Sequence, residues 1–271
     1  ATCQLWTAAC SPLPSQIVRA VHVGFLLLLA FGRLANARPS RDHAWWAWWL
    51  LGALSFVLGL YHWVYYEELI LRAGDPNTLD IVVGVIVVAL VFEASRLLMG
   101  SALPILCGIF LGYALLGEFL PAPLDHRGYA FAQVVAQMFL GTEGIYGIPP
   151  YVSSTYIFLF ILFGSFLEQA GMIKLFTDFA MGLFGHKTGG PAKVSVVSSA
   201  LMGTINGSGV ANVVTTGQFT IPLMKRFGYP AHFAGAVEAT ASMGGQLMPP
   251  VMGAVAFIMA ETIDVPYVEI C

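Results

Sequence analysis

Residues 45–66 carry the pattern that decides the fold, WWAWWLLGALSFVLGLYHWVYY. Tryptophans bound this apolar stretch at one end, and tyrosines with a further tryptophan bound it at the other. Aromatic rings of this kind gather at the two interfaces of a bilayer, and a helix needs about 20 apolar residues to cross the hydrocarbon core. The stretch therefore predicts a membrane-spanning helix.

Four further stretches predict helices of the same kind, at residues 17–34, 79–99, 101–120 and 151–170. They lack the period-two alternation of β-barrel strands. Only 10% of the residues are charged, whereas an ordinary soluble domain carries about 25%. The sequence thus predicts an all-α, multi-pass integral membrane protein. A net charge of −3 without a basic run excludes a nucleic-acid partner.

The loop charges predict an orientation. Basic residues gather in two loops, as Arg33, Arg38 and Arg41 in the first and as Lys174, Lys187 and Lys193 further along the chain. The positive-inside rule places both loops in the cytoplasm and the amino terminus outside. Residues 121–150 are then an amphipathic segment at the outer face, and residues 172–188 form an arm along the inner face.

A glycine-rich stretch at residues 203–212, GTINGSGVAN, interrupts two apolar helical limbs between residues 191 and 227. Each limb is too short to cross the hydrocarbon core, and basic residues stand at both feet. This pattern predicts a re-entrant helical hairpin. Irregular backbone at membrane depth needs protein or water around it, which leaves its amides and carbonyls available to a ligand.

A second interruption follows at residues 244–250, GGQLMPP, inside a helical stretch over residues 231–262. Proline removes helix hydrogen bonds, so carbonyls one turn upstream lose their partners. We expect a discontinuous helix here. Paired broken elements mark substrate and ion sites in secondary transporters.

Simpler explanations fit these residues too. The glycine-rich tip is also the composition of a tight turn, and Asn206, Ser208, Asn212 and Gln246 are also residue types that join membrane helices by hydrogen bonds. Glu238 is a candidate intramembrane carboxylate in a proton relay. It fits equally well as a partner of a neighbouring helix.

No pattern of catalysis is present. The sequence lacks the HExxH and GxSxG signatures, and Gly207-x-Gly209 has neither the preceding strand nor the following Gly-Lys pair of a nucleotide loop. The four cysteines, Cys3, Cys10, Cys107 and Cys271, form no CxxC pair that would predict a zinc site. We expect no enzyme activity and no organic cofactor.

Three stretches together carry a resemblance: GGPAK at residues 189–193, GTINGSGVANV at 203–213 and GGQLMPPVMG at 244–253. They strongly resemble the fused permease of TRAP (tripartite ATP-independent periplasmic) transporters, of the TAXI-associated type. The match is dense from about residue 140 to 270. Before that it is only topological, so that residues 1–120 resemble the small, four-helix TRAP subunit and residues 121–271 resemble the start of the large transport subunit.

The resemblance implies a sodium-driven secondary transporter of the bacterial inner membrane, which imports organic acids delivered by a periplasmic substrate-binding protein. Membrane lipids would surround it, and sodium would be the coupling ion. By position, the sodium and substrate site would be formed by the hairpin tip and the broken helix, that is by Asn206, Gly207, Ser208, Gly209, Asn212, Gly244, Gly245, Gln246 and Met248. Sodium itself would contact Asn206, Ser208 and Gly244.

The length departs from the family, whose members pair one hairpin and one broken helix with an inverted second copy. One copy stands in this sequence. We therefore expect the amino-terminal part of a permease. The alternative is a non-transporting membrane scaffold or assembly fragment.

Overall fold

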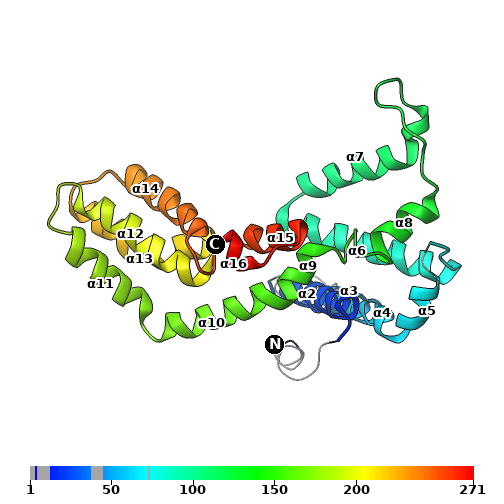
Figure 1. Ribbon diagram of the computed structural model, residues 1–271, viewed down its shortest axis with the longest axis horizontal. Helices are drawn as coiled ribbons and strands as arrows, with labels where there is room; N and C mark the ends of the chain where they lie inside the picture. Colours follow the sequence, from blue (N-terminus) through cyan, green and yellow to red (C-terminus); the bar gives the residue numbers. More distant parts are fainter. Residues whose placement is uncertain (1–3, 5–12, 38–44, 73) are drawn as a thin grey trace. The chain divides into compact units, whose positions relative to one another are not determined.

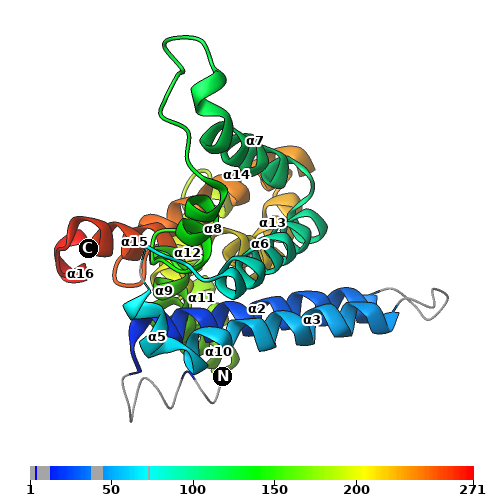
Figure 2. The ribbon, with the colours of Figure 1, turned by 90° about the vertical axis from the view of Figure 1, so that its right-hand side faces the viewer.

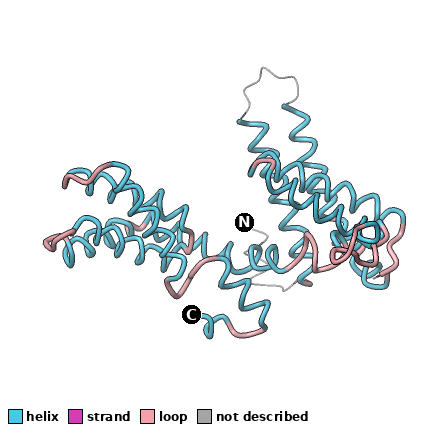
Figure 3. The backbone as a smooth tube through the Cα atoms, turned by 90° about the horizontal axis from the view of Figure 1, so that it is seen from above, coloured by secondary structure: helices cyan, strands magenta, loops and turns pink. Residues whose placement is uncertain are grey.

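The computed structural model describes residues 4, 13–37, 45–72 and 74–271. In this part of the chain every regular element is a helix, as Figure 3 shows. The predicted features at Cys3, Cys10, Arg38 and Arg41 lie outside the described residues. The chain divides into two compact units, Ala1–Ser154 and Thr155–Cys271.

Five helices are long and apolar enough to cross a membrane: Ser15–Asn36, Trp45–Val64, Thr78–Met99, Ala102–Phe119 and Ile148–Gln169. They coincide with the five predicted spans to within a few residues at each end. The prediction of an all-α, multi-pass membrane protein is therefore confirmed.

The fifth span begins earlier than the sequence predicted. Pro149 and Pro150 stand just before the predicted span 151–170, but they lie in the first turn of α9 (Ile148–Val152). Proline is tolerated there because the first N–H groups of a helix have no partner in any case. A π-helical turn, η2 (Ser153–Ile157), then leads into α10 (Phe158–Gln169).

The first unit is built on two helices that lie side by side, α2 (Ser15–Ala37) and α3 (Trp45–Gly59), seen in blue in Figure 2. Glycines permit this close approach, because a Cβ atom at Gly59 would lie 3.0 Å from the carbonyl oxygen of Ala20. The unit continues with α4 (Tyr61–Val64), α5 (Tyr66–Leu71), α6 (Thr78–Met99), α7 (Ala102–Leu116), η1 (Gly117–Phe119) and α8 (Phe131–Phe139).

The core of this unit joins α2 and α6 to the end of α8 and the segment that follows it. Phe31 and Val87 are buried together with Phe139 and Tyr146. The Nε2 atom of buried His62 lies 3.0 Å from the carbonyl oxygen of Phe139. Of the amphipathic segment predicted over residues 121–150, only α8 and the start of α9 are α-helical, and loops make up most of the rest.

The second unit contains α10, α11 (Met172–Phe184), α12 (Gly190–Asn206), α13 (Gly209–Arg226), α14 (Ala231–Gly244), η3 (Gly245–Leu247), α15 (Ala254–Ile263) and α16 (Tyr267–Ile270), in the order shown in Figure 1. Helices α12, α13 and α14 pack against one another. Neither α12 nor α13 is among the five helices suited to cross a membrane. The buried face of α12 is formed largely by serine and glycine, whose small side chains let the three helices approach closely.

Candidate functional site

The tip between α12 and α13 is a tight, internally bonded turn. Gly207 takes the left-handed conformation with φ +58°, which closes α12 in the way glycine commonly does. The Oδ1 atom of Asn206 accepts a hydrogen bond from the Ser208 N–H at 3.1 Å. The Ser208 hydroxyl in turn accepts one from the Ala211 N–H at 3.3 Å, as an N-cap of α13.

The irregular tip is therefore shorter than the glycine-rich sequence predicted. Helix α12 continues through Gly203 to Asn206, and α13 begins already at Gly209, so that only two residues lie between the helices. The glycines at 203 and 209 serve packing rather than chain reversal. With 17 residues, α12 is about 25 Å long, which is less than the ~30 Å of a hydrocarbon core.

The break between α14 and α15 is a folded loop. After the 3₁₀ turn η3, the Gly253 N–H donates to the carbonyl oxygen of Gln246 at 2.7 Å, which closes the loop. Met252 within it has φ +54°, a left-handed conformation that is unusual for a residue other than glycine. The Tyr267 hydroxyl lies within hydrogen-bonding distance of two carbonyl oxygens, those of Pro250 at 2.9 Å and Val251 at 2.6 Å.

Glycines bring the tip and the break into direct contact. A Cβ atom at Gly207 would lie 1.8 Å from the carbonyl oxygen of Met252, and one at Gly203 would lie 2.4 Å from the Cα atom of Gly245. A Cβ atom at Gly209 would lie 2.6 Å from the Met243 sulfur and 2.7 Å from the side-chain nitrogen of Gln246. At Gly203 and Gly207 the opposing atoms belong to the backbone, so the two elements fit together only with glycine at these two positions, whereas the side chains facing Gly209 can shift.

A cavity of about 290 Å³ lies at this contact, entirely within the second unit. Its polar lining comes from the tip residues Asn206, Gly207, Ser208 and Gly209 and from Gln246. Aromatic and aliphatic side chains complete it, among them those of Ile157, Phe160, Val210, Val251, Met252 and Phe257. Phe257 is held by stacking against Tyr267 at 4.2 Å between ring centroids.

The structure thus places five of the nine predicted site residues around one cavity. The other four lie elsewhere: Asn212 and Gly245 are buried between the helices, whereas Gly244 and Met248 do not line the cavity. Of the three positions expected to contact sodium, Asn206 and Ser208 line the cavity and Gly244 does not.

Two buried amide atoms, one on each of two asparagines, lack a hydrogen-bond partner among the described residues. One is the side-chain nitrogen of Asn206, and the other is the Oδ1 atom of Asn212, whose own nitrogen donates to the carbonyl oxygen of Ser199 at 2.7 Å. Buried polar atoms are nearly always bonded. Unpaired groups at a cavity wall and one helical turn below it are therefore candidate ligand contacts.

Glu238 lies apart from the cavity, fully buried between α12, α13 and α14. Its carboxyl group accepts hydrogen bonds from five hydroxyl groups, those of Ser195, Ser199, Thr216, Thr220 and Ser242. Sequence reasoning identified Glu238 and missed all five hydroxyls. A signal was present, because the six residues form three pairs with four-residue spacing, 195 and 199, 216 and 220, 238 and 242, each on one face of its helix.

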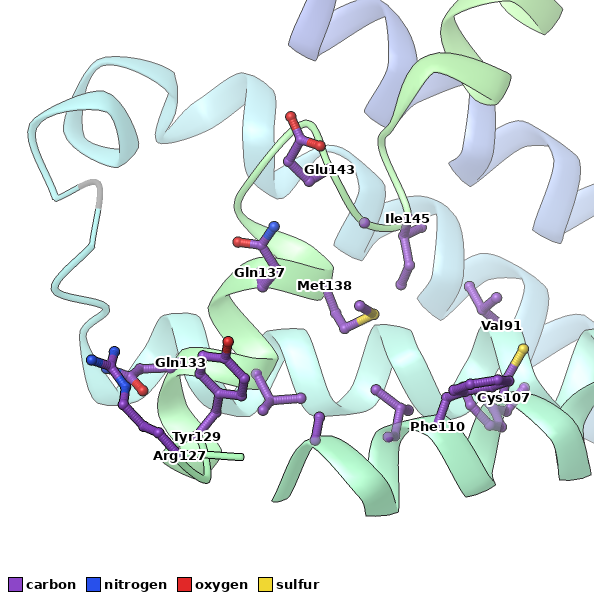
Figure 4. A pocket seen from close by; sticks show the side chains of 15 residues that line it. Val91, Cys107, Phe110, Arg127, Tyr129, Gln133, Gln137, Met138, Glu143 and Ile145 are labelled. Atoms are coloured by element: carbon purple, nitrogen blue, oxygen red, sulfur yellow. The ribbon is translucent and has the colours of Figure 1, made fainter. Parts of the chain in front are cut away.

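A cavity of the first unit is a different kind of feature. It measures about 970 Å³ and contains none of the predicted site residues. Figure 4 shows polar side chains, including Arg127, Gln133 and Gln137, at one end and apolar ones, including Val91 and Phe110, at the other. The apolar end lies along α6 and α7, two helices suited to cross a membrane, where apolar side chains are expected.

In the part of the chain that the structure describes, no group of three or more His, Cys, Asp or Glu residues comes together. The candidate site is therefore built from amides, hydroxyls, backbone groups and one carboxyl group. Such groups bind ions and polar solutes.

Comparison with known proteins locates a family match over the same part of the chain. Residues 86–271 match the family described as "Tripartite ATP-independent periplasmic transporter, DctM component". No solved structure matches this chain.

Several curated proteins are similar. A putative TRAP transporter large permease protein of Haemophilus influenzae is 29% identical over 161 residues, which cover 59% of this chain and 36% of that protein. The C4-dicarboxylate TRAP transporter large permease protein DctM of Rhodobacter capsulatus is 35% identical over 103 residues, 38% of this chain and 23% of that protein. The isethionate TRAP transporter permease protein DctMQ of Oleidesulfovibrio alaskensis is 29% identical over 178 residues, 63% of this chain and 27% of that protein. The chain spans only about a quarter to a third of the length of these relatives.

Proposed function

Because this chain belongs to the DctM-component family of tripartite ATP-independent periplasmic transporters, we propose that it forms part of a sodium-driven permease that imports an organic acid. The observation that carries the proposal is the cavity between the hairpin tip and the broken helix. It joins two interrupted helical elements, the arrangement in which secondary transporters bind substrate and ions.

An anionic substrate suits the polar groups of this cavity. The first N–H groups of α13, at Gly209 and Val210, have no carbonyl one turn before them and stand at the positive end of the helix dipole. The Asn206 side chain offers an unpaired N–H group beside them. Two of the relatives are named for C4-dicarboxylate and for isethionate, which are organic acids.

Sodium would be bound by oxygen atoms of the same region. We propose Asn206, Ser208 and Gly244 as contacts, with backbone carbonyls supplying further oxygens without burying a full charge.

We further propose that the permease lies in the bacterial inner membrane and receives its substrate from a periplasmic substrate-binding protein. The family name and the five membrane-crossing helices support this placement. Such a binding protein would select the substrate before the permease does.

The test is uptake into proteoliposomes by the permease that contains this chain, with its binding protein and an imposed sodium gradient. In Asn206→Ala and Ser208→Ala we expect the sodium concentration for half-maximal uptake to rise roughly tenfold. This is the ratio expected when one polar group that contacts an ion is removed. Ser165→Ala is the control, because that hydroxyl bonds only to the backbone of its own helix, at Ile161.

Two results would contradict the proposal. If both tip variants took up substrate with unchanged sodium dependence, the tip would not be a sodium-binding site. A correctly inserted wild-type permease without any uptake would favour the non-transporting scaffold.

A further inference from the structure

Glu238 is surrounded by hydroxyl groups and does not line the cavity proposed as the substrate site. The hydroxyl groups of Thr216 and Ser195 lie 2.6 Å from its two carboxyl oxygens, and those of Ser199 and Ser242 lie at 3.0 Å. Thr220 donates as well. Helices α12, α13 and α14 each contribute, so that the carboxyl group is enclosed by oxygen atoms on several sides.

No cationic side chain balances this carboxyl group. Glu238 takes part in none of the three ion pairs found among the described residues. The basic residues of α14 and of the two helices packed against it, Lys193, Lys225, Arg226 and His232, are all exposed. A buried carboxylate without a counter-ion is costly unless hydroxyl dipoles, a proton or a bound cation compensate it.

The hydroxyl groups can serve two states of the carboxyl group. A hydroxyl carries one proton, yet Thr216 lies within reach of Glu238 at 2.6 Å and of the Asn212 carbonyl oxygen at 2.8 Å. Thr220 likewise reaches both Glu238 and the Thr216 carbonyl oxygen. When the O–H groups of the two threonines donate to Glu238, they compensate its charge. When they donate to the backbone carbonyls instead, their oxygen lone pairs face the carboxyl group and can bind a cation.

A second observation points the same way. The unpaired Oδ1 atom of Asn212 is fully buried and belongs to the residue one helical turn before Thr216. Its amide nitrogen is held by the Ser199 carbonyl oxygen. The region therefore contains one more oxygen acceptor than the protein's own donors satisfy, which is the composition expected around a cation.

From these contacts we propose that Glu238, with the hydroxyl groups of Ser195, Ser199, Thr216, Thr220 and Ser242, is a binding site for a monovalent cation, a proton or a sodium ion, separate from the sodium site proposed at the hairpin tip. The inference rests on the proposed transport function, since a site of this kind contributes a second coupling ion. Occupancy turns the hydroxyl protons of Thr216 and Thr220 away from the carboxyl group. It thereby changes the contacts that join the two hairpin arms to α14.

The experiment compares Glu238→Gln with Glu261→Gln, the same substitution at an exposed position of α15. Uptake into proteoliposomes is measured while external pH and sodium are varied separately. If the cation is a proton, Glu238→Gln abolishes the pH dependence of uptake and leaves its sodium dependence in place. If it is sodium, Glu238→Gln lowers the number of sodium ions coupled to each substrate. In both cases Glu261→Gln behaves as wild type.

A milder variant guards against misfolding of Glu238→Gln. Thr220→Val keeps the side-chain shape and removes one hydroxyl, and we expect it to shift the pH or sodium concentration for half-maximal uptake roughly threefold to tenfold, the value of one hydrogen bond. Infrared difference spectra of the wild type, recorded on a pH or sodium step, should show a carboxyl signal that is unchanged in Glu261→Gln.

Unchanged pH and sodium dependence in Glu238→Gln and in Thr220→Val, or an absent carboxyl signal in the wild type, would overturn the inference and leave Glu238 as a structural link between the helices. If the wild-type permease shows no uptake, the proposed function is contradicted instead. The two failures are therefore distinguishable.

Discussion

Gly203→Ala tests the contact between the hairpin and the broken helix directly. The added Cβ atom would lie 2.4 Å from both the Cα atom and the carbonyl oxygen of Gly245. Carbon atoms in contact are ordinarily about 3.5–4.0 Å apart. The obstacle is backbone and not the end of a flexible side chain. Helix α12 and η3 must therefore separate by roughly 1 Å.

Two effects of opposite sign set the magnitude. Alanine in a helix interior is favoured over glycine by about 1 kcal/mol. Overpacking a close contact costs about 1–3 kcal/mol. We expect the upper part of that range, because the new Cβ atom meets the backbone of Gly245, which cannot change rotamer as a side chain can. The net loss of stability is therefore about 1–2 kcal/mol.

The matched control is Gly235→Ala on α14. No atom outside its own helix lies within 4 Å of a Cβ atom at this position. The same substitution should here raise stability by about 0.5–1 kcal/mol. Thermal melting of the purified permease in detergent measures both variants, and each kcal/mol corresponds to a shift of roughly 2–4 °C for a protein of 150–250 residues. If Gly235→Ala raises the melting temperature as expected, a Gly203→Ala variant that melts at or above the wild type would refute the proposed close packing.

Three further substitutions test separate contacts by the same melting measurement. Tyr267→Phe removes the hydroxyl that bonds two backbone carbonyls of the break and should cost about 1 kcal/mol; an unchanged melting temperature would contradict the recorded bonds. Gly84→Ala places a Cβ atom 2.7 Å from a methyl carbon of Val135, a side-chain end that can move, so we expect a smaller loss than for Gly203→Ala, and an equal or larger loss would count against this distinction. Asp80→Asn removes the buried charge that Arg72 approaches at 3.2 Å and should cost about 1–3 kcal/mol, whereas a neutral outcome would show that the pair contributes nothing.

The membrane-spanning helices could be predicted because one physical quantity defines them. Hydrocarbon thickness sets the length of an apolar run, and residues 45–66 also carry aromatic rings at both ends. The predicted start of the fifth span was wrong by three residues. Proline breaks a helix when it lies in the interior but is permitted in the first turn, where Pro149 lies. Which of these applies depends on where the helix begins, and the proline itself does not specify that.

The irregular tip was predicted at the right place and with the wrong length. Glycine in a sequence signals either a left-handed conformation or a close approach of another chain segment, and the two uses look alike. Gly207 serves both uses, because its φ is +58° and its Cα atom lies against Met252. Gly203 and Gly209 serve the second alone. Only the contacts with Gly245 and Gln246, far along the chain, separate these roles.

The surroundings of Glu238 could be predicted only in part. Four-residue spacing places 195 with 199, 216 with 220 and 238 with 242 on single helix faces, which the sequence alone reveals. That these three faces meet is a tertiary fact, set by the packing of α12, α13 and α14. Ser and Thr are also common at membrane helix contacts without any ligand, so the residue types did not single out these five hydroxyls.

The Glu238 hydroxyl cluster and the tip cavity are joined through a short chain of contacts. Ser199 donates its hydroxyl to Glu238 at 3.0 Å, while its carbonyl oxygen holds the Asn212 amide at 2.7 Å. That amide nitrogen lies 2.7 Å from where a Cβ atom of Gly245 would stand, and Gly245 directly precedes Gln246 of the cavity wall. A cation that reorients the hydroxyls around Glu238 therefore acts on groups in contact with the break itself. Since a buried network of this kind has discrete hydrogen-bond arrangements, binding at one end biases the arrangement at the other. Reciprocity then requires that a ligand in the cavity changes the cation affinity of Glu238 by the same factor.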